Sequence, residues 1–239
     1  MALVNFRDIG GIKLSNGKSI KKQILFRTGS LSFLGKNEAE CLLKKTNVNC
    51  YIDFRNNLEI KERNLKGYIS DKIRKLYRLN FDTEDDIFSS IYLPDSCDWA
   101  DFYKRIFEKN LEKIIVFLEI LFQECNKPII FGCSAGKDRC GIMTAVLLSV
   151  LGVSNSEIIK DYCLSNQGLV DYYHFFNDSK KLLGRTRKEF IKHFLIVSED
   201  TMMLFMHNID ADYGGFLRCL FNAGLDESIV KALKTQFIE

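Results

Sequence analysis

Cys133 and Arg139 are the residues of this chain whose types and spacing most directly indicate chemistry. They stand six positions apart and enclose the segment CSAGKDR, residues 133–139. A cysteine thiolate is a strong nucleophile, and a guanidinium is a planar donor group that binds two oxygens of one phosphate. This combination predicts phosphoryl transfer through a cysteinyl-phosphate intermediate.

An apolar run on each side of this segment predicts the elements that position it. Residues 128–131 (PIIF) are typical of a buried strand, and residues 142–151 are typical of a buried helix. The segment between them is therefore expected to be a strand-to-helix turn, where backbone N–H groups and the helix dipole attract an anion. A thiol that faces such a site has a depressed pKa, so we expect Cys133 to be a thiolate near neutral pH.

Three other interpretations of this segment compete with the phosphate-binding loop. A buried cysteine is often a small hydrophobic residue, and a glycine-containing loop is often a simple turn. The nucleotide-binding P-loop is also similar, but Gly132 and Gly136 are one residue too close for that motif. Asp138 also stands where that motif needs a magnesium-binding Ser or Thr, so we exclude a nucleotide P-loop.

Four segments of the chain, taken in order, resemble the motifs of one family. Residues 133–139 resemble the C-x5-R signature of cysteine-dependent protein phosphatases. Residues 5–11 (NFRDIGG), 25–32 (LFRTGSLS) and 52–55 (IDFR) resemble further motifs of one branch, the bacterial tyrosine-phosphatase-like family of dual protein and phosphoinositide specificity. Residues 213–225 fit the C-terminal helices of that family. The resemblance covers most of the chain, and four motifs in order are far more specific than the loop alone.

The resemblance implies an α/β fold, with one domain over residues 1–239 and a small, mainly parallel central sheet flanked by helices. It implies a hydrolase of phosphotyrosine, with phosphoserine, phosphothreonine or phosphoinositides as further substrates. Cys133 would attack phosphorus, and no metal or other cofactor is needed because the loop neutralises the phosphate charge. The residues that would bind the phosphate oxygens are Ser134, Ala135, Gly136, Lys137, Asp138 and Arg139.

Such a reaction needs an acid that protonates the leaving oxygen, and two aspartates are candidates. Asp82 is the first residue after a strand expected at residues 75–81. It begins an acidic segment, and acidic segments are usually solvated loops. Asp138 lies within the C-x5-R loop, close to the reacting phosphate. Lys137 beside it would either attract a second phosphate, as on a phosphoinositide, or be a solvated lysine.

The chain departs from the family on both sides of the signature. Gly132 replaces the usual histidine, and Cys140 replaces a Ser or Thr whose hydroxyl steadies the thiolate as it leaves the phosphoenzyme. A thiol is a weaker donor, so we expect a slower second step. Cys140 is either a packing thiol in the first turn of the helix or a partner that forms a disulfide with an oxidised Cys133.

Two other functions compete with the hydrolase. The residues at positions 132 and 140 fit a phosphate- or phosphopeptide-binding module with weak or no turnover. A rhodanese-like sulfurtransferase also uses a loop cysteine, but the terminal Arg139 and the three flanking motifs disfavour it. Assays of aryl phosphate turnover, phosphopeptide binding and thiosulfate–cyanide exchange separate the three functions.

Composition narrows the partners and the location. The chain has 239 residues, and its hydrophobic content of 46% suffices for one core. Its net charge of +3 is too small to indicate nucleic-acid binding. Eight cysteines without a C-x-x-C pair, and three histidines, make a metal site unexpected and favour reduced thiols in the cytoplasm.

Residues 1–3 lead into the first motif without a signal peptide, although secretion without a recognisable signal stays open. The longest apolar run, residues 141–153, is too short to span a bilayer. The expected partners are a phosphorylated protein or a phosphoinositide, with no stable membrane anchor.

Periodicity and turn residues place the remaining elements. Strands are expected at residues 3–9, 24–27, 49–54, 75–81 and 128–131, and helices at 36–45, 59–64, 98–110, 111–125, 142–151, 154–164, 200–208, 213–222 and 226–237.

Asp53 and Arg55, at the end of the third strand, are expected to form a structural salt bridge. Arg7 and Asp8 form either an exposed ion pair or part of an ordered motif near the active face. Residues 166–198 form either an ordinary amphipathic region or a surface that meets an anionic substrate or headgroup.

Overall fold

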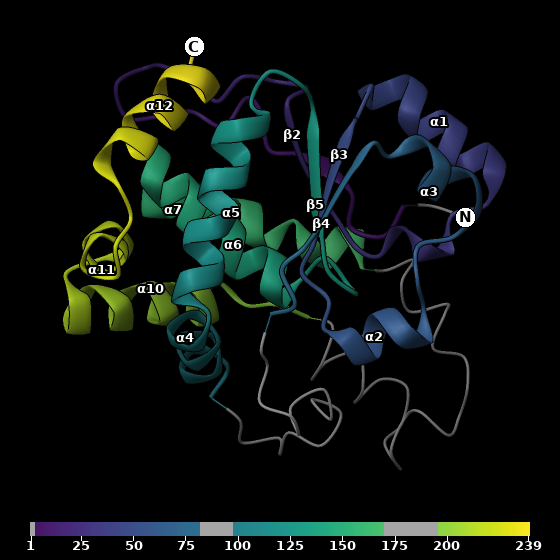
Figure 1. Cartoon of the computed structure of the whole chain (residues 1–239). Coiled ribbons are helices and arrows are strands. Elements are labelled where there is room, and N and C mark those ends of the chain that lie inside the picture. Colours follow the sequence, from purple (N-terminus) through teal and green to yellow (C-terminus); the bar gives the residue numbers. More distant parts are fainter. Residues whose placement is uncertain (1–2, 82–97, 170–195) are drawn as a thin grey trace.

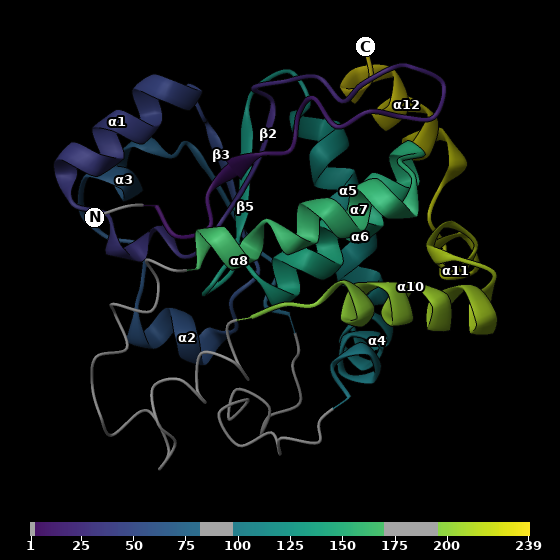
Figure 2. The ribbon, with the colours of Figure 1, turned by 180° about the vertical axis from the view of Figure 1, so that it is seen from behind.

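The computed structural model describes residues 3–81, 98–169 and 196–239, and this part of the chain forms a five-stranded sheet between two layers of helices (Figures 1 and 2). The strand order is β1-β2-β5-β3-β4. Strands β2, β5, β3 and β4 are parallel, and β1 pairs antiparallel with β2. The expected α/β fold with a small, mainly parallel sheet is therefore confirmed. The strands are β1 (Arg7–Asp8), β2 (Leu25–Thr28), β3 (Cys50–Asp53), β4 (Lys75–Arg78) and β5 (Ile129–Gly132).

The helices cover the two faces of the sheet unequally. Helices α1 and α3 lie on one face, whereas α5, α6, α7 and α12 lie on the other, and α2 stands beyond the carboxyl ends of the parallel strands (Figures 1 and 2). The helices are η1 (Leu31–Phe33), α1 (Lys36–Thr46), α2 (Asn57–Glu62), α3 (Gly67–Lys72), α4 (Trp99–Lys109), α5 (Leu111–Glu124), α6 (Asp138–Leu151), α7 (Asn155–Cys163), α8 (Ser165–Gly168), α10 (Glu199–Tyr213), α11 (Phe216–Asn222) and α12 (Glu227–Phe237).

Strand β5 and helix α6 form the centre of the core. All four residues of β5 are buried, because β2 and β3 flank the strand and helices cover both faces of the sheet. A continuous apolar run such as Ile129-Ile130-Phe131 is what a buried parallel strand requires. Helix α6 is buried on nearly its whole circumference, as expected for a helix that is apolar all round. The connection between β5 and α6 is therefore anchored at both ends by packed elements.

The structure differs from the expected elements at several places. The strand expected at residues 3–9 is wrong except for Arg7–Asp8, because Asn5 has a φ of +49° and turns the chain. The last expected strand residues, 79–81, lie beyond β4, and Asn80 has a φ of +41°. Helix α3 was not expected. The helix expected at residues 154–164 is confirmed as α7 with Ser154 as its N-cap residue, although the Ser154 side chain makes no capping bond.

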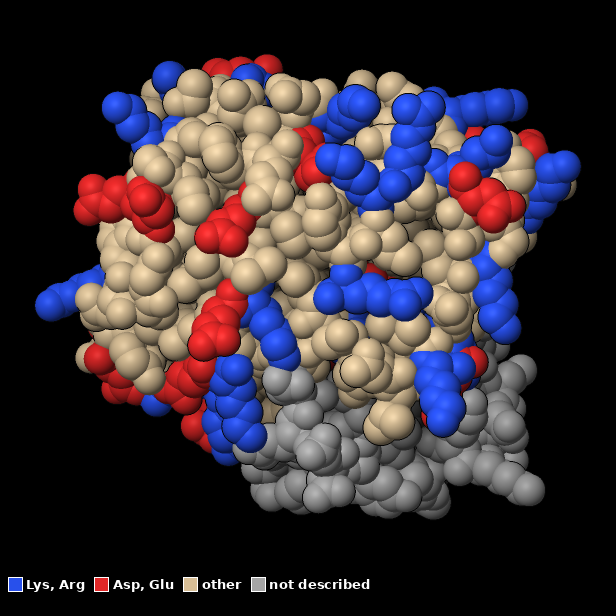
Figure 3. Space-filling view, viewed as in Figure 1, with Lys and Arg blue, Asp and Glu red and all other residues tan. Residues whose placement is uncertain are grey.

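Charge is distributed unevenly over the described surface. Lys and Arg side chains gather on the side that carries α1 and α3, whereas Asp and Glu are more frequent on the opposite side (Figure 3). Helix α1 contributes Lys36, Lys44 and Lys45 to the basic side, and α3 contributes Lys72. A net charge of only +3 therefore coexists with a local excess of positive charge.

Candidate active site

The C-x5-R loop, residues 133–139, connects β5 with the first turn of α6 (Figure 1). Gly132 at the end of β5 pairs with Thr28 of β2 and Asp53 of β3, so the loop leaves from the middle of the carboxyl edge of the sheet. Ligands of parallel α/β sheets bind at this edge. The N-terminus of α6 adds positive potential at the same place, as the strand–turn–helix pattern predicts.

Packing explains why glycine stands before the cysteine. A Cβ at Gly132 would lie 3.0 Å from the hydroxyl oxygen of Tyr51 and 3.1 Å from atoms of Thr28. Tyr51 is fully buried, and its hydroxyl has no hydrogen-bond partner among the described residues. The Tyr51 ring thus occupies space next to the loop that a larger residue at position 132 would need.

Two outward-facing carbonyl groups fix the shape of the loop. The carbonyl of Ser134 accepts a hydrogen bond from the N–H of Ser30 at 3.0 Å. The carbonyl of Gly136 accepts hydrogen bonds from Asn5 Nδ2 at 2.7 Å and from Arg27 Nη2 at 2.8 Å. In a trans peptide the carbonyl and the next N–H point in opposite directions, so these bonds turn the N–H groups of residues 135 and 137 away from the protein scaffold. Inward-facing N–H groups are what an anion site requires.

Only glycine fits at position 136. Gly136 has a φ of +68°, and a Cβ there would lie 2.6 Å from the N of Gly29 and 2.7 Å from the carbonyl carbon of Thr28. The loop therefore lies directly on the backbone that follows β2. The expected anion-binding residues Ser134, Ala135 and Asp138 are half-buried, whereas Gly136, Lys137 and Arg139 are buried, so the loop opens to its surroundings on one side.

A buried charge network supports the loop from behind. Arg7 Nε and Arg27 Nη1 contact the two oxygens of Asp161 at 2.8 and 2.7 Å, and Arg7 Nη1 donates to Asn5 Oδ1 at 2.5 Å. Burial raises the pKa of Asp161, but Arg27 and Arg7 outweigh this and hold it below its usual value. Arg7 therefore belongs to an ordered motif and does not pair with Asp8, whose carboxylate accepts from the N–H groups of Gly10 and Gln23.

Arg139 is held by a carboxylate that the sequence analysis missed. Its Nη1 and Nη2 atoms contact Glu59 Oε2 and Oε1 at 2.6 and 2.7 Å, and Nη1 also donates to the carbonyl of Phe54 at 3.1 Å. Glu59 further accepts from the Ser134 hydroxyl and from the N–H of Asn56. Burial raises the pKa of Glu59, yet the charge and hydrogen bonds of Arg139 lower it overall. The reciprocal bonds between Asn56 and Glu59 form a capping box at the start of α2, and the segment N-x-x-E was a readable signal of it.

Cys133 is accompanied by a second thiol. Cys140 Sγ donates to Cys133 Sγ at 3.4 Å and lies 3.5 Å from the carbonyl oxygen of Thr28. Burial alone would raise the pKa of Cys133, but the thiol of Cys140, the charge of Arg139 and the N–H of Cys140 together lower it to about 6. Burial and the neighbouring Cys133 raise the pKa of Cys140 well above its usual value. The two sulfurs therefore form a thiolate and a thiol at neutral pH.

Asp138 lies at the opening of the loop in contact with two other elements. The Tyr103 hydroxyl of α4 is 2.6 Å from Asp138 Oδ1 and 2.7 Å from the Tyr162 hydroxyl of α7. Lys137 Nζ lies 3.3 Å from the same Asp138 oxygen and 4.8 Å from the centre of the Trp99 ring. Burial, followed by the charge of Asp138, raises the pKa of Tyr103, so this tyrosine is a hydrogen-bond donor. Lys137 is buried rather than a solvated lysine.

Two further sequence-based expectations concern this edge of the sheet. Asp53 and Arg55 form a buried salt bridge at 2.6 Å, and Arg55 also donates to the Ser30 and Ser32 hydroxyls. Because the N–H of Ser30 holds the loop carbonyl of Ser134, this salt bridge supports the loop indirectly. Asp82, the other candidate acid, lies outside the described residues, as does most of the 166–198 segment.

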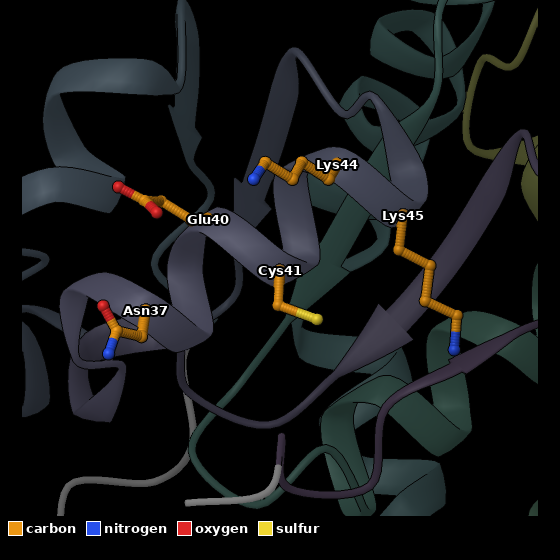
Figure 4. Close-up of a pocket in the computed structure, with 5 residues that line it drawn as sticks. All are labelled: Asn37, Glu40, Cys41, Lys44 and Lys45. Carbon is orange, nitrogen blue, oxygen red and sulfur yellow. The ribbon is translucent and has the colours of Figure 1, made fainter.

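A separate hollow lies on the outer surface of α1 (Figure 4). It is lined by Asn37, Glu40, Cys41, Lys44 and Lys45, all from this one helix, and none belongs to the C-x5-R loop. Within residues 3–81, 98–169 and 196–239, no helix is long and apolar enough to cross a bilayer. The same three ranges contain no cluster of three His, Cys, Asp or Glu side chains that could hold a metal ion.

The family of the chain follows from its match to known proteins. Residues 1–239 match the model of the tyrosine phosphatase family, and the chain belongs to this family. The expected resemblance to cysteine-dependent phosphatases is thereby confirmed at the level of the family.

Several relatives carry phosphatase names. A protein of Cupriavidus necator named, provisionally, a tyrosine-protein phosphatase is 25% identical over 178 residues, which cover 68% of this chain and 60% of that protein. The chain thus spans less than two thirds of the length of that relative. The triple specificity protein phosphatase PtpB of Mycobacterium tuberculosis is 20% identical over 96% of this chain and 95% of its own. Among solved structures, the catalytic core of the PP-IP phosphatase SIW14 of S. cerevisiae has a TM-score of 0.39 and 15% identity, covering 87% of this chain and 95% of that one.

Proposed function

We propose that the protein hydrolyses phosphomonoesters at the C-x5-R loop, and that residues 1–239 act as one catalytic domain in the cytoplasm. The observation that carries this proposal is the position of the Cys133 sulfur, with a pKa lowered to about 6, beside the N-terminus of α6 and the guanidinium of Arg139. A thiolate next to a site built for an anion is suited to attack a phosphate and poorly suited to a purely structural role.

The proposed reaction has two steps. The Cys133 thiolate attacks phosphorus, an S–P bond forms, and the bond to the leaving oxygen breaks as Asp138 gives that oxygen a proton. A water then attacks phosphorus, Asp138 takes its proton, and the S–P bond breaks to release phosphate and the thiolate. Arg139 and the N–H groups of residues 134–139 bind the three non-bridging oxygens throughout.

We propose Asp138 as the acid, rather than Asp82, because Asp138 lies at the opening of the loop beside Cys133 and Arg139. The Tyr103 hydroxyl, 2.6 Å from Oδ1, orients the carboxyl group. The substrates we propose are phosphotyrosine and, with Lys137 close to the loop, phosphoinositides; phosphoserine and phosphothreonine are further candidates. The partner is therefore a phosphorylated protein or a phosphoinositide, and no metal takes part in either step.

A panel of substrates tests this proposal directly. Phosphotyrosine peptides, phosphoserine peptides, phosphoinositides and an activated aryl phosphate are each incubated with the purified protein, and released phosphate is measured. Cys133→Ser keeps the loop but supplies an alcohol that is not ionised at neutral pH, so turnover should be lost while phosphate binding persists. Substantial residual hydrolysis by this variant would refute the mechanism.

A phosphate- or phosphopeptide-binding module remains the second candidate. The observation that favours it is Cys140, whose weakly donating thiol occupies the place where a hydroxyl would assist the second step. Rapid mixing with an activated aryl phosphate distinguishes the two. A stoichiometric burst without turnover indicates a trapped phosphoenzyme, and binding without any burst indicates a binding module.

A further inference from the structure

Cys133 and Cys140 are a pair whose arrangement permits a second chemistry besides phosphoryl transfer. Their sulfur atoms are 3.4 Å apart, and both side chains are buried at the junction of the loop and α6. A disulfide bond has an S–S length of about 2.05 Å, so the two sulfurs need to approach each other by only about 1.4 Å. A hydroxyl at position 140 would make the same hydrogen bond but could not form this bond.

We propose that this pair is an oxidative modification site: a hydroperoxide oxidises Cys133, and Cys140 converts the product into a Cys133–Cys140 disulfide that reversibly blocks the loop. The inference rests on the proposed function in one respect, since the blocked residue is the nucleophile proposed above. The modification itself is defined by the two thiols and does not depend on the substrate.

The chemistry balances in two steps when hydrogen peroxide is the oxidant. The Cys133 thiolate attacks one peroxide oxygen, the O–O bond breaks, and a sulfenic acid and hydroxide form. The Cys140 sulfur then attacks the Cys133 sulfur, the S–O bond breaks, and the departing hydroxide takes the Cys140 proton to become water. One thiolate and one thiol are oxidised to one disulfide, and one peroxide is reduced to one water and one hydroxide. A dithiol reverses the modification by exchange.

The surroundings assign different roles to the two sulfurs. Only a thiolate reacts readily with peroxide, and Cys133 is the thiolate of the pair, with Arg139 nearby and the Cys140 thiol as its hydrogen-bond donor. Cys140 is a thiol that faces Cys133 and the carbonyl of Thr28. Oxidation therefore begins at Cys133, and Cys140 is in position to react with the sulfenic acid before a second peroxide converts it irreversibly to a sulfinic acid.

Mass spectrometry tests the modification without reference to activity. The protein is treated with hydrogen peroxide, remaining thiols are blocked with N-ethylmaleimide, and the product is digested with trypsin without reductant. Lys137 and Arg139 lie between the two cysteines, so trypsin separates them unless a disulfide joins their peptides. We expect one linked pair of peptides that dithiothreitol separates. Because Lys127 precedes Pro128, Cys125 stays on the Cys133 peptide, and its N-ethylmaleimide label shows that Cys133 is the linked residue. Absence of this linked pair at peroxide doses that inactivate the protein would overturn the proposal.

Two variants show what Cys140 contributes. Cys140→Ser keeps a hydrogen-bond donor but lacks the sulfur, so peroxide should add about 32 Da to Cys133 as a sulfinic acid that dithiothreitol does not remove. Cys41→Ser removes an exposed thiol of α1 (Figure 4) and serves as the control that should behave like the wild type. If Cys140→Ser fails to fold, Cys140→Thr replaces it, and the linked peptide of the wild type still decides the result.

Activity measured in parallel separates this proposal from the proposed function. We expect the wild type to lose more than 90% of its phosphatase activity with peroxide and to regain most of it with dithiothreitol, whereas Cys140→Ser regains less than a tenth. Equal recovery by the two proteins would refute the protective role of Cys140. If the protein shows no turnover but the linked peptides form, the proposed function fails and the modification stands.

Discussion

Glu59 offers the sharpest test of how the loop is assembled, because each of its oxygens accepts from two donors. Oε1 accepts from Arg139 Nη2 and the Ser134 hydroxyl, and Oε2 accepts from Arg139 Nη1 and the N–H of Asn56. In Glu59→Gln, one oxygen becomes an NH2 group that must face an N–H group of Arg139 whichever way the amide is turned. The substitution therefore removes the charge and leaves donors unsatisfied without changing the volume of the side chain.

The magnitude follows from the burial of the pair. The Arg139 and Glu59 side chains are 4% and 13% exposed, and breaking a buried ion pair costs about 3–5 kcal/mol. Allowing for the partial exposure of Glu59, we expect Glu59→Gln to lower the free energy of unfolding by about 2–4 kcal/mol. In a domain of this size, that corresponds to a fall in Tm of about 4–16 °C. Since the pKa of Glu59 is lowered in the fold, this stabilisation is complete above the usual carboxyl pKa and is lost as the pH falls through the lowered one.

Inorganic phosphate should raise the Tm of Glu59→Gln and so offset part of the loss of stability caused by the substitution. An anion in the loop compensates the uncovered charge of Arg139, so the increase in Tm caused by saturating inorganic phosphate should be larger for Glu59→Gln than for the wild type. Thermal unfolding with and without phosphate measures both effects. Glu62→Gln, an exposed position on the same helix, is the control and should match the wild type in both. A Glu59→Gln protein with unchanged Tm, or with a smaller phosphate effect, would refute the assigned role of Glu59.

Four further substitutions probe other parts of the site. The rate of Cys133 alkylation by iodoacetamide should follow a pKa of about 6 and fall as the pH drops below this value. Cys140→Ala removes the thiol that donates to Cys133 and should move the midpoint of this pH profile to higher pH. A midpoint near 9 in the wild type would contradict the lowered pKa of Cys133. Tyr103→Phe removes a hydrogen-bond donor to Asp138 and should shift the basic limb of the pH profile of kcat to higher pH. Asp138→Asn should slow the hydrolysis of alkyl phosphates far more than that of activated aryl phosphates. If neither substitution has its expected effect, another residue is the acid. In Arg27→Lys, the single ammonium group cannot contact both Asp161 and the Gly136 carbonyl of the loop. The affinity for inorganic phosphate, measured by titration calorimetry, should therefore fall about tenfold, and an unchanged Kd would contradict this role of Arg27.

Local sequence signals were sufficient for the loop and its two flanking elements. The apolar runs before and after residues 133–139 are each long enough to be buried, and glycine at position 136 marks the tight turn between them. Propensity and pattern act over a few residues here, so β5 and α6 follow from the sequence. The same reasoning failed at residues 3–6 (LVNF), where a short segment rich in apolar residues resembles a strand. There the positive φ of Asn5 and a bond from its N–H to the carbonyl of Gly168 turn the chain instead.

The partners of the loop could not be read from the sequence because they come from distant segments. Glu59 precedes Arg139 by 80 positions, and Asp161 follows Arg27 by 134. In the sequence, Glu59 is one polar residue of a short helix, and Tyr103 and Tyr162 fit the apolar faces of two amphipathic helices. Which of these side chains meets the loop depends on the parallel pairing of β3 with β5 and on the packing of α4 and α7 against α6. Local periodicity encodes none of these contacts.

The contacts explain which positions around the loop tolerate change. Gly136 is fixed twice, since a Cβ there would lie 2.6 Å from the backbone N of Gly29 and its carbonyl is held by Asn5 and Arg27. The Cys140 side chain contacts Cys133 Sγ and the carbonyl oxygen of Thr28, and a hydroxyl at this position could donate to either of them. The shape of the loop and the chemistry at its sulfur are therefore set by different residues. A chain can acquire a second thiol beside its nucleophile without altering the anion site, and this independence allows an oxidative modification to be added to a phosphatase fold.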